Sequence, residues 1–132
     1  MAGARDAASK LVVVVDDDRL VLDAMSGLLR SWRFTVVTGA SERAATELLA
    51  AHDRPPDVII CDYRLAPGTT GLDVIDSLRG GSGIPAFLIT AEASSELMRE
   101  GEARDVRVLA KPVAPELLRG LLRDVFKKRP RA

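Results

Sequence analysis

Short apolar runs alternate along the chain with stretches in which apolar residues recur every three or four positions. The runs are Leu11–Val15, Phe34–Val37, Val58–Cys61, Pro85–Ile89 and Val106–Leu109. The run Leu11–Val15 is continuous, which is typical of a strand that is covered on both faces. Each run is followed by a stretch with helical spacing, and the last of these has Pro115 where the first helical position is expected. The alternation predicts an α/β fold of the doubly wound class, with five parallel strands and helices on both faces.

The predicted helices differ in how firmly their apolar residues anchor them. The first and last carry full apolar stripes: Val21, Met25, Leu28, Leu29 and Trp32 in the first, and Leu117, Leu118, Leu121, Leu122, Val125 and Phe126 in the last. The fourth, over residues 93–101, has only Leu97 and Met98 as large apolar anchors. We therefore expect the fourth helix to be the most weakly attached. Asp18 and Ser41 are the residue types that cap helix N-termini.

The chain has 132 residues, which suits one domain with a sizeable core. We expect this domain to span residues 10–127. Residues 1–9 precede the first apolar run and are predicted to form a disordered leader or linker. Residues 128–132 are predicted to form a solvated basic tail.

Composition narrows the range of partners. The formal net charge is zero, so there is no overall electrostatic attraction for nucleic acid. No apolar run approaches the roughly 18 residues that span a bilayer, and no signal peptide precedes the first strand. The single cysteine, Cys61, excludes an internal disulfide and is compatible with a reducing compartment. These features predict a cytoplasmic domain without direct nucleic-acid or membrane contact.

Four groups of polar residues that suit binding or chemistry lie where apolar runs end. They are Asp16-Asp17-Asp18, Asp62, Thr90 and Lys111-Pro112. In an open parallel sheet the carboxyl ends of the strands lie on one edge, where ligands bind. Carboxylates, a hydroxyl and an ammonium from distant parts of the chain should therefore meet in one pocket. This set suits a divalent metal ion and a phosphoryl group.

Four segments resemble the receiver domain of two-component response regulators. They read VVVVDDD, DVIICDYRL, FLITA and AKPV, in the family's order and at similar separations, within residues 10–127. The resemblance implies a flavodoxin-like strand order of 2-1-3-4-5 and phosphorylation of an aspartate by a histidine kinase or a histidine phosphotransfer domain. The DYRL opening and the KPV segment also look like the C-terminal receivers of hybrid histidine kinases. Such a domain catalyses its own phosphorylation and dephosphorylation but is mainly a signalling switch.

The acidic residues match the family's motif position by position. Asp62 matches the phosphoacceptor, and a carboxylate is a competent nucleophile toward phosphorus. Asp16 and Asp17 match the acidic pair that holds Mg²⁺, which prefers oxygen ligands. Asp62 and the backbone carbonyl of Arg64 are expected to complete the protein ligands. Asp18 is expected to cap the first helix instead.

The remaining motif residues match groups that contact the phosphoryl oxygens. Lys111 matches the phosphate-binding lysine, and the family pattern places a cis peptide before Pro112. Thr90 matches the switch hydroxyl, which can donate a hydrogen bond to a phosphoryl oxygen. Many family members carry an aromatic residue three positions before the lysine, where this chain has Val108. We therefore expect no aromatic rotamer switch at that position.

Two alternatives to a phosphorylated receiver remain open at this point. The first strand, its aspartates, Thr90 and Lys111 also resemble haloacid-dehalogenase-type phosphohydrolases, in which Asp16 would be the nucleophile and Asp18 the acid/base. That reading gives Asp62 no role, and no acidic pair follows Lys111. The second alternative is a pseudo-receiver that only binds partners, which the complete set of motif residues disfavours.

Four other side chains have simpler interpretations. His52 lies at a helix end without a partner motif and is expected to be exposed and not catalytic. Cys61 alternates to the face opposite Asp62 and is expected to be a buried, unreactive thiol. Arg64 and Glu92 have opposite charges and flank the expected phosphoryl pocket, so they are expected to pair across its mouth.

Overall fold

The computed structural model describes residues 9–65 and 67–128 and contains one five-stranded parallel sheet. The strands are β1 (Leu11–Val15), β2 (Thr35–Gly39), β3 (Val58–Asp62), β4 (Ala86–Thr90) and β5 (Arg107–Ala110). Their spatial order is β2-β1-β3-β4-β5, and every neighbouring pair is parallel. The predicted strand order is therefore confirmed.

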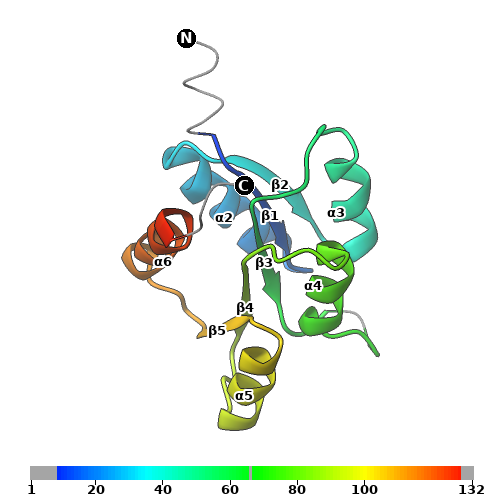
Figure 1. The fold of residues 1–132 in the computed structure, drawn as a ribbon, viewed down its shortest axis with the longest axis vertical. Coiled ribbons are helices and arrows are strands. Elements are labelled where there is room, and N and C mark those ends of the chain that lie inside the picture. The colour runs from blue at the N-terminus through cyan, green and yellow to red at the C-terminus, as the bar shows by residue number, and fades with distance from the viewer. Residues whose placement is uncertain (1–8, 66, 129–132) are drawn as a thin grey trace.

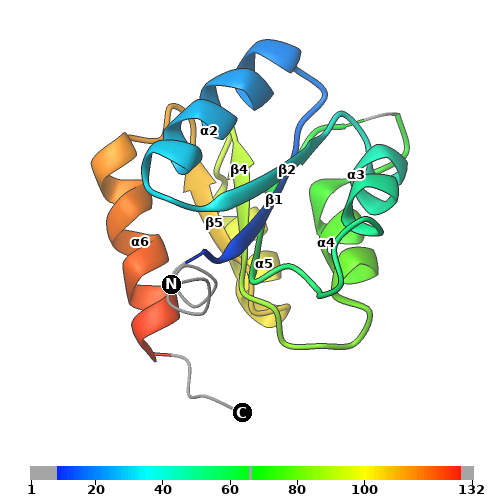
Figure 2. The same ribbon diagram turned by 90° about the horizontal axis from the view of Figure 1, so that it is seen from above.

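Five helices cover the two faces of the sheet. They are α2 (Arg19–Ser31), α3 (Glu42–Leu49), α4 (Gly71–Arg79), α5 (Ser95–Ala103) and α6 (Pro115–Lys128). Helices α2 and α6 lie on one face, and α3, α4 and α5 lie on the other (Figures 1 and 2). This arrangement confirms the predicted doubly wound α/β class.

The alternation of side chains along β1 explains why the sheet has two cores. Leu11, Val13 and Val15 pack with residues of α3, α4 and α5. Val12 and Val14 pack with residues of α2 and α6. All five side chains are buried, because both faces of a central parallel strand are covered by helices.

The helix starts follow the capping residues. The side chain of Asp18 accepts a hydrogen bond from the amide of Leu20, and that of Ser41 accepts one from the amide of Ala44. Both predicted caps are therefore confirmed, and Asp18 serves the fold. The Asp18 cap sets the start of α2 directly beyond the acidic residues that follow β1.

The predicted burial was wrong for several residues at the borders of the apolar stripes. Met98 and Leu117 are about half exposed, at 50% and 52%, so they do not anchor their helices as predicted. Leu22 is buried, although the predicted stripe omitted it. Phe34 precedes β2 and packs against Phe126, with their ring centroids 5.8 Å apart. Exposure depends on how a helix is rotated against the sheet, which spacing alone does not determine.

The predicted leader and tail fall mostly outside the described residues. Of the leader only Ser9 is described, and its backbone carbonyl accepts a hydrogen bond from Arg54 at 2.9 Å. Lys128 is the last residue of α6, so the first residue assigned to the tail belongs to a helix. Within the described ranges, no helix combines the length and apolar character that crossing a membrane requires.

Candidate functional site

The carboxyl ends of four strands bring the expected polar side chains together. Asp16 follows β1, Asp62 ends β3, Thr90 ends β4 and Lys111 follows β5. The Lys111 ammonium Nζ lies 3.1 Å from Asp62 Oδ1 and 3.6 Å from Asp16 Oδ2. One cation therefore bridges two carboxylates that lie far apart in the sequence. These side chains come together because β1, β3, β4 and β5 are neighbouring parallel strands, whose carboxyl ends lie at the same edge of the sheet.

Three carboxylates form a cluster at this edge. One oxygen from each of Asp16, Asp17 and Asp62 lies within 4.8 Å of the others. Asp16 and Asp62 are buried, at 4% and 9% exposure, whereas Asp17 is exposed. A compact group of carboxylate oxygens with one open side suits a hard divalent cation that keeps part of its water.

Burial and repulsion by neighbouring carboxylates disfavour the charged form of Asp16. Burial is the main reason that the pKa of Asp16 is raised, and the negative charge of Asp62 raises it further. The backbone amide of Asp18 and the charge of Lys111 oppose this shift only in part. Burial lowers the pKa of Lys111, but its hydrogen bond to Asp62 and the two carboxylate charges outweigh burial and raise it. Lys111 therefore stays charged beside the two aspartates.

A backbone hydrogen bond positions the hydroxyl of Thr90. Its side chain is buried, and Oγ1 accepts a hydrogen bond from the amide of Glu92 at 3.2 Å. This bond uses the oxygen as acceptor and leaves the hydroxyl hydrogen able to donate. The same backbone bond orients residue 92, whose carboxylate pairs with Arg64 at 3.1 Å. The expected Arg64–Glu92 pair therefore exists, and both side chains are about three-quarters exposed, at 77% and 76%.

Two finer expectations concern the backbone around the site. The Lys111–Pro112 peptide is cis, as the resemblance implied. Arg64 forms an isolated antiparallel bridge with Thr70, which ties down the start of the loop after β3. The role of the Arg64 carbonyl as a metal ligand stays a prediction.

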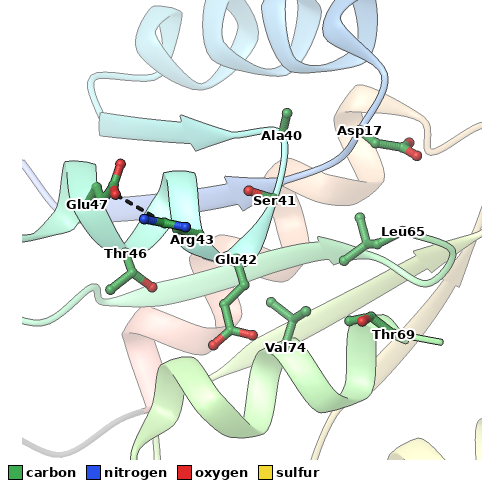
Figure 3. Close-up of a pocket in the computed structure, with 10 residues that line it drawn as sticks. All are labelled: Asp17, Ala40, Ser41, Glu42, Arg43, Thr46, Glu47, Leu65, Thr69 and Val74. Atoms are coloured by element: carbon green, nitrogen blue, oxygen red, sulfur yellow. Dashed lines mark hydrogen bonds and ion pairs between the residues drawn. The ribbon is translucent and has the colours of Figure 1, made fainter. Parts of the chain in front are cut away.

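Two pockets adjoin the cluster from different sides. A pocket of about 420 Å³ is lined by Asp16, Asp62 and Lys111 together with mostly apolar residues of α2 and the segment after β5. A second pocket, of about 600 Å³, lies between α3 and α4 and contains only Asp17 from the cluster (Figure 3). Asp17 lies at the opposite end of this pocket from the Arg43–Glu47 pair (Figure 3). The first pocket therefore contains two of the three clustered carboxylates and Lys111, and the second contains the third carboxylate.

The sequence model of the response regulator receiver domain matches residues 12–123, which is most of the chain. The chain belongs to this family. The five parallel strands in the order β2-β1-β3-β4-β5 agree with this assignment.

Relatives of known structure support the assignment. The chemotaxis protein CheY4 of Vibrio cholerae is 31% identical, with a TM-score of 0.77 over 89% of this chain and 99% of that one. A two-component response regulator from Clostridium difficile has a TM-score of 0.80 at 15% identity, a likeness that concerns the fold alone.

Curated relatives are longer than this receiver domain. The transcriptional regulatory protein KdpE of Mycobacterium tuberculosis is 36% identical over 85 residues, which cover 64% of this chain and 36% of the relative. The DNA-binding response regulator MtrA of Mycolicibacterium smegmatis is 34% identical over 91 residues, which cover 68% of this chain and 38% of the relative. The chain matches less than two-fifths of the length of these relatives.

Membership of the receiver family decides against the phosphohydrolase alternative. Asp18, the acid/base in that alternative, caps α2 instead.

Cys61 is buried beneath the site, and burial raises the pKa of its thiol, as expected for an unreactive side chain. His52 is half-buried rather than exposed as expected. It follows the end of α3, where its amide donates to the carbonyl of Leu49 at 2.9 Å.

Proposed function

We propose that Asp62 of this receiver domain accepts a phosphoryl group from a phosphohistidine and thereby switches the domain. The observation that supports this assignment most is the contact at 3.1 Å between Asp62 Oδ1 and the Lys111 ammonium. Among the clustered carboxylates, Asp62 ends the central strand β3, beside β4 with Thr90. A phosphoryl group on Asp62 would therefore lie between a cation and a hydroxyl donor.

The transfer step exchanges one bond to phosphorus for another. A carboxylate oxygen of Asp62 attacks phosphorus, a P–O bond forms, and the P–N bond to the donor imidazole breaks. The bonding electron pair leaves with the imidazole nitrogen. Lys111 stays protonated and pairs with one phosphoryl oxygen after transfer. The hydroxyl of Thr90 donates a hydrogen bond to a second phosphoryl oxygen. In dephosphorylation, a water oxygen attacks phosphorus and the P–O bond to Asp62 breaks. The carboxylate of Asp62 is regenerated, and inorganic phosphate and a proton leave to solvent.

The ligand set of the cluster fits Mg²⁺. Asp16, Asp17 and Asp62 would hold it through carboxylate oxygens, together with the backbone carbonyl of Arg64. When bound, the ion offsets the repulsion among the carboxylates and the charge that develops on the phosphoryl oxygens. Asp17 is the exposed member, so it lies at the side from which the cation enters.

The donor is proposed to be a histidine kinase or a histidine phosphotransfer domain in the cytoplasm. The support is family membership, because receiver domains take their phosphoryl group from such proteins. A place in a hybrid histidine kinase is the finer proposal, which rests on the DYRL and KPV segments. The DNA binding named for MtrA concerns that longer protein and is not proposed for these residues.

Mapping the acyl phosphate tests the assignment. The protein is incubated with acetyl phosphate and Mg²⁺, and the modified aspartate is identified by peptide mass mapping. We expect the label on Asp62. A label on Asp16 would support the phosphohydrolase alternative, and an unlabelled protein would support a pseudo-receiver.

A further inference from the structure

Helix α5 has an unusual attachment at its C-terminal end. Its last turn contains no basic residue to interact with the carbonyl groups that a helix end leaves unpaired. Arg79 of the neighbouring helix α4 supplies the missing cation at this end. Its Nη1 donates to the carbonyl of Arg104 and its Nη2 to that of Asp105, each at 2.7 Å, and its Nε donates to the carbonyl of Ile84 at 2.8 Å. One guanidinium thus joins the end of α5 to the segment before β4.

Arg104, the residue that ends α5, makes the reverse contact to α4. Its Nη1 donates to Asp76 Oδ2 at 3.0 Å and lies 3.8 Å from Asp73 Oδ1. Its Nη2 lies 3.7 Å from Glu100 of its own helix. We call Arg79 and Arg104 with these partners the α4–α5 clamp. Partly exposed ion pairs add little individually, but the three charge-assisted bonds of the rigid Arg79 fork fix a geometry.

Close packing against β5 reinforces the same end of α5. A Cβ atom on Gly101 would lie 2.8 Å from Val108 Cγ2 and 2.9 Å from the carbonyl oxygen of Val106. The amide of Val106 in turn bonds to the carbonyl of Gly101 at 2.7 Å. The lack of a side chain at Gly101 therefore lets the C-terminal half of α5 approach β5 closely, against the side chain of Val108. Val108 is half-buried beside this contact.

The N-terminal half of α5 lies instead over a pocket that reaches the candidate site. The pocket has a volume of about 250 Å³ and is lined by Tyr63, Arg64, Thr90, Glu92, Ser94, Glu96, Leu97 and Glu100. Leu97 is the buried anchor of this half, and Met98 beside it is 50% exposed. The half of α5 nearer to Thr90 thus has free volume that reaches Thr90. A separate pocket of about 520 Å³ adjoins the far half and is lined by Met98, Arg99, Glu102 and residues 105–108, so the clamp and the Gly101 contact, not the lack of a pocket, are what hold that half.

We propose that α5 pivots about its clamped C-terminal end, so that a change at Thr90 moves only its N-terminal half. This inference rests on the proposed function, because phosphorylation of Asp62 supplies the change. When Thr90 turns toward a phosphoryl oxygen, the pocket beneath Ser94 and Leu97 changes shape. The clamp and the Gly101 contact hold the other end. Arg79 and Arg104 are positioning residues that convert a local change into rotation of one half-helix.

Hydrogen exchange read by mass spectrometry tests the pivot in the intact chain. The unligated protein is compared with protein saturated with Mg²⁺ and beryllofluoride, which mimics an acyl phosphate. We expect the exchange change to be concentrated in residues 92–98. The amides of Arg104, Asp105 and Val106, which bond to carbonyls of Gly101 and Glu102, should stay unchanged.

Two variants remove the clamp from either side. In Arg79→Lys the three-pronged contact is lost while the charge stays, and in Arg104→Ala the contacts to α4 are lost. Either should speed exchange of the Arg104–Val106 amides in the unligated protein by roughly tenfold or more. The beryllofluoride response should then extend along the whole of α5. Arg43→Ala, which breaks an exposed pair on α3, is the matched control and should keep the wild-type pattern.

The outcomes separate the pivot from the function on which it rests. A uniform wild-type response along α5 would overturn the pivot, as would clamp variants that exchange like the Arg43→Ala control. If the wild type binds no beryllofluoride, the proposed function fails, whereas exchange in the unligated variants still decides whether the clamp holds this end.

Discussion

Two aspartates at opposite ends of β3 show how one strand serves both stability and chemistry. Asp57, just before the strand, uses its carboxylate for the fold: Oδ2 accepts from the buried amide of Leu11 at 2.7 Å and pairs with Arg54 at 3.1 Å. Asp62, at the other end, meets Lys111 and lies near Asp16, a second buried carboxylate. The first aspartate has its partners in the folded chain. The second aspartate lies beside Lys111 and other carboxylates, in an arrangement that suits a bound cation and a phosphoryl group.

The largest expected effect concerns metal binding at the chemical end. Asp17→Ala removes the exposed ligand of the cluster, so the affinity for Mg²⁺ should fall by roughly tenfold or more. The fold should survive, because Asp17 is exposed. Isothermal titration with Mg²⁺ measures the affinity, and Asp23→Ala, an exposed carboxylate change on α2, is the control. Unchanged affinity would remove Asp17 from the site.

A large stability effect is expected at the structural end. Asp57→Ala removes the acceptor of a buried strand amide and should lower the free energy of unfolding by about 1–3 kcal/mol. Urea unfolding in chelator measures this loss. Phosphorylation of the folded variant should stay close to that of the wild type. A variant that is fully stable would show that the contrast between the two ends is wrong.

The opposite sign is expected for Asp16. Its pKa is raised above the ordinary value of 3.8 mainly by burial, so the folded protein loses stability as the pH rises from that value through the raised pKa. Asp16→Asn keeps an acceptor for the Asp18 amide and removes the buried charge. In chelator it should raise the melting temperature by roughly 2–6 °C near neutral pH, or about 1 kcal/mol, and by less near pH 4. A lower melting temperature at neutral pH would contradict this.

The smallest effect is expected at the exposed rim. The Arg64–Glu92 pair contributes only about 0–1 kcal/mol to stability, but it can limit the approach of water to the phosphoryl group. Truncation of either residue to alanine should speed autodephosphorylation by up to roughly tenfold, equivalent to about 1.4 kcal/mol. The double variant should add little, because a paired gate opens once. Strictly additive rates, or slower decay in either single variant, would exclude a gate.

Sequence reasoning predicted the chemical end of β3 better than the structural end. Asp62, Thr90 and Lys111 follow apolar runs, so strand periodicity and the family motif together placed them on one edge. Asp57 follows Pro55-Pro56 and looks like an ordinary turn residue. Its bond to Leu11 joins positions 46 residues apart, and no local pattern encodes that contact.

The clamp of α5 was missed for the same physical reason. Arg79 looks like a cation at the end of its own helix, where such residues are common. Its bonds to Arg104 and Asp105 depend on how α4 and α5 are placed side by side. The sequence did indicate that the fourth predicted helix is weakly anchored. In the structure, the half nearer to Thr90 lies over a pocket that Thr90 also lines and carries the half-exposed Met98, whereas Arg79 and Arg104 hold the other end.

Intact-protein mass after incubation with acetyl phosphate and Mg²⁺ tests the central claim most directly. The wild type and Asp57→Asn should each gain one phosphoryl group, because the substituted amide keeps an oxygen for the Leu11 N–H and lies at the opposite end of β3 from the cluster. Asp62→Asn should gain none while it stays folded by circular dichroism. Labelling of Asp62→Asn to the wild-type level would contradict the assignment of Asp62 as the phosphoacceptor.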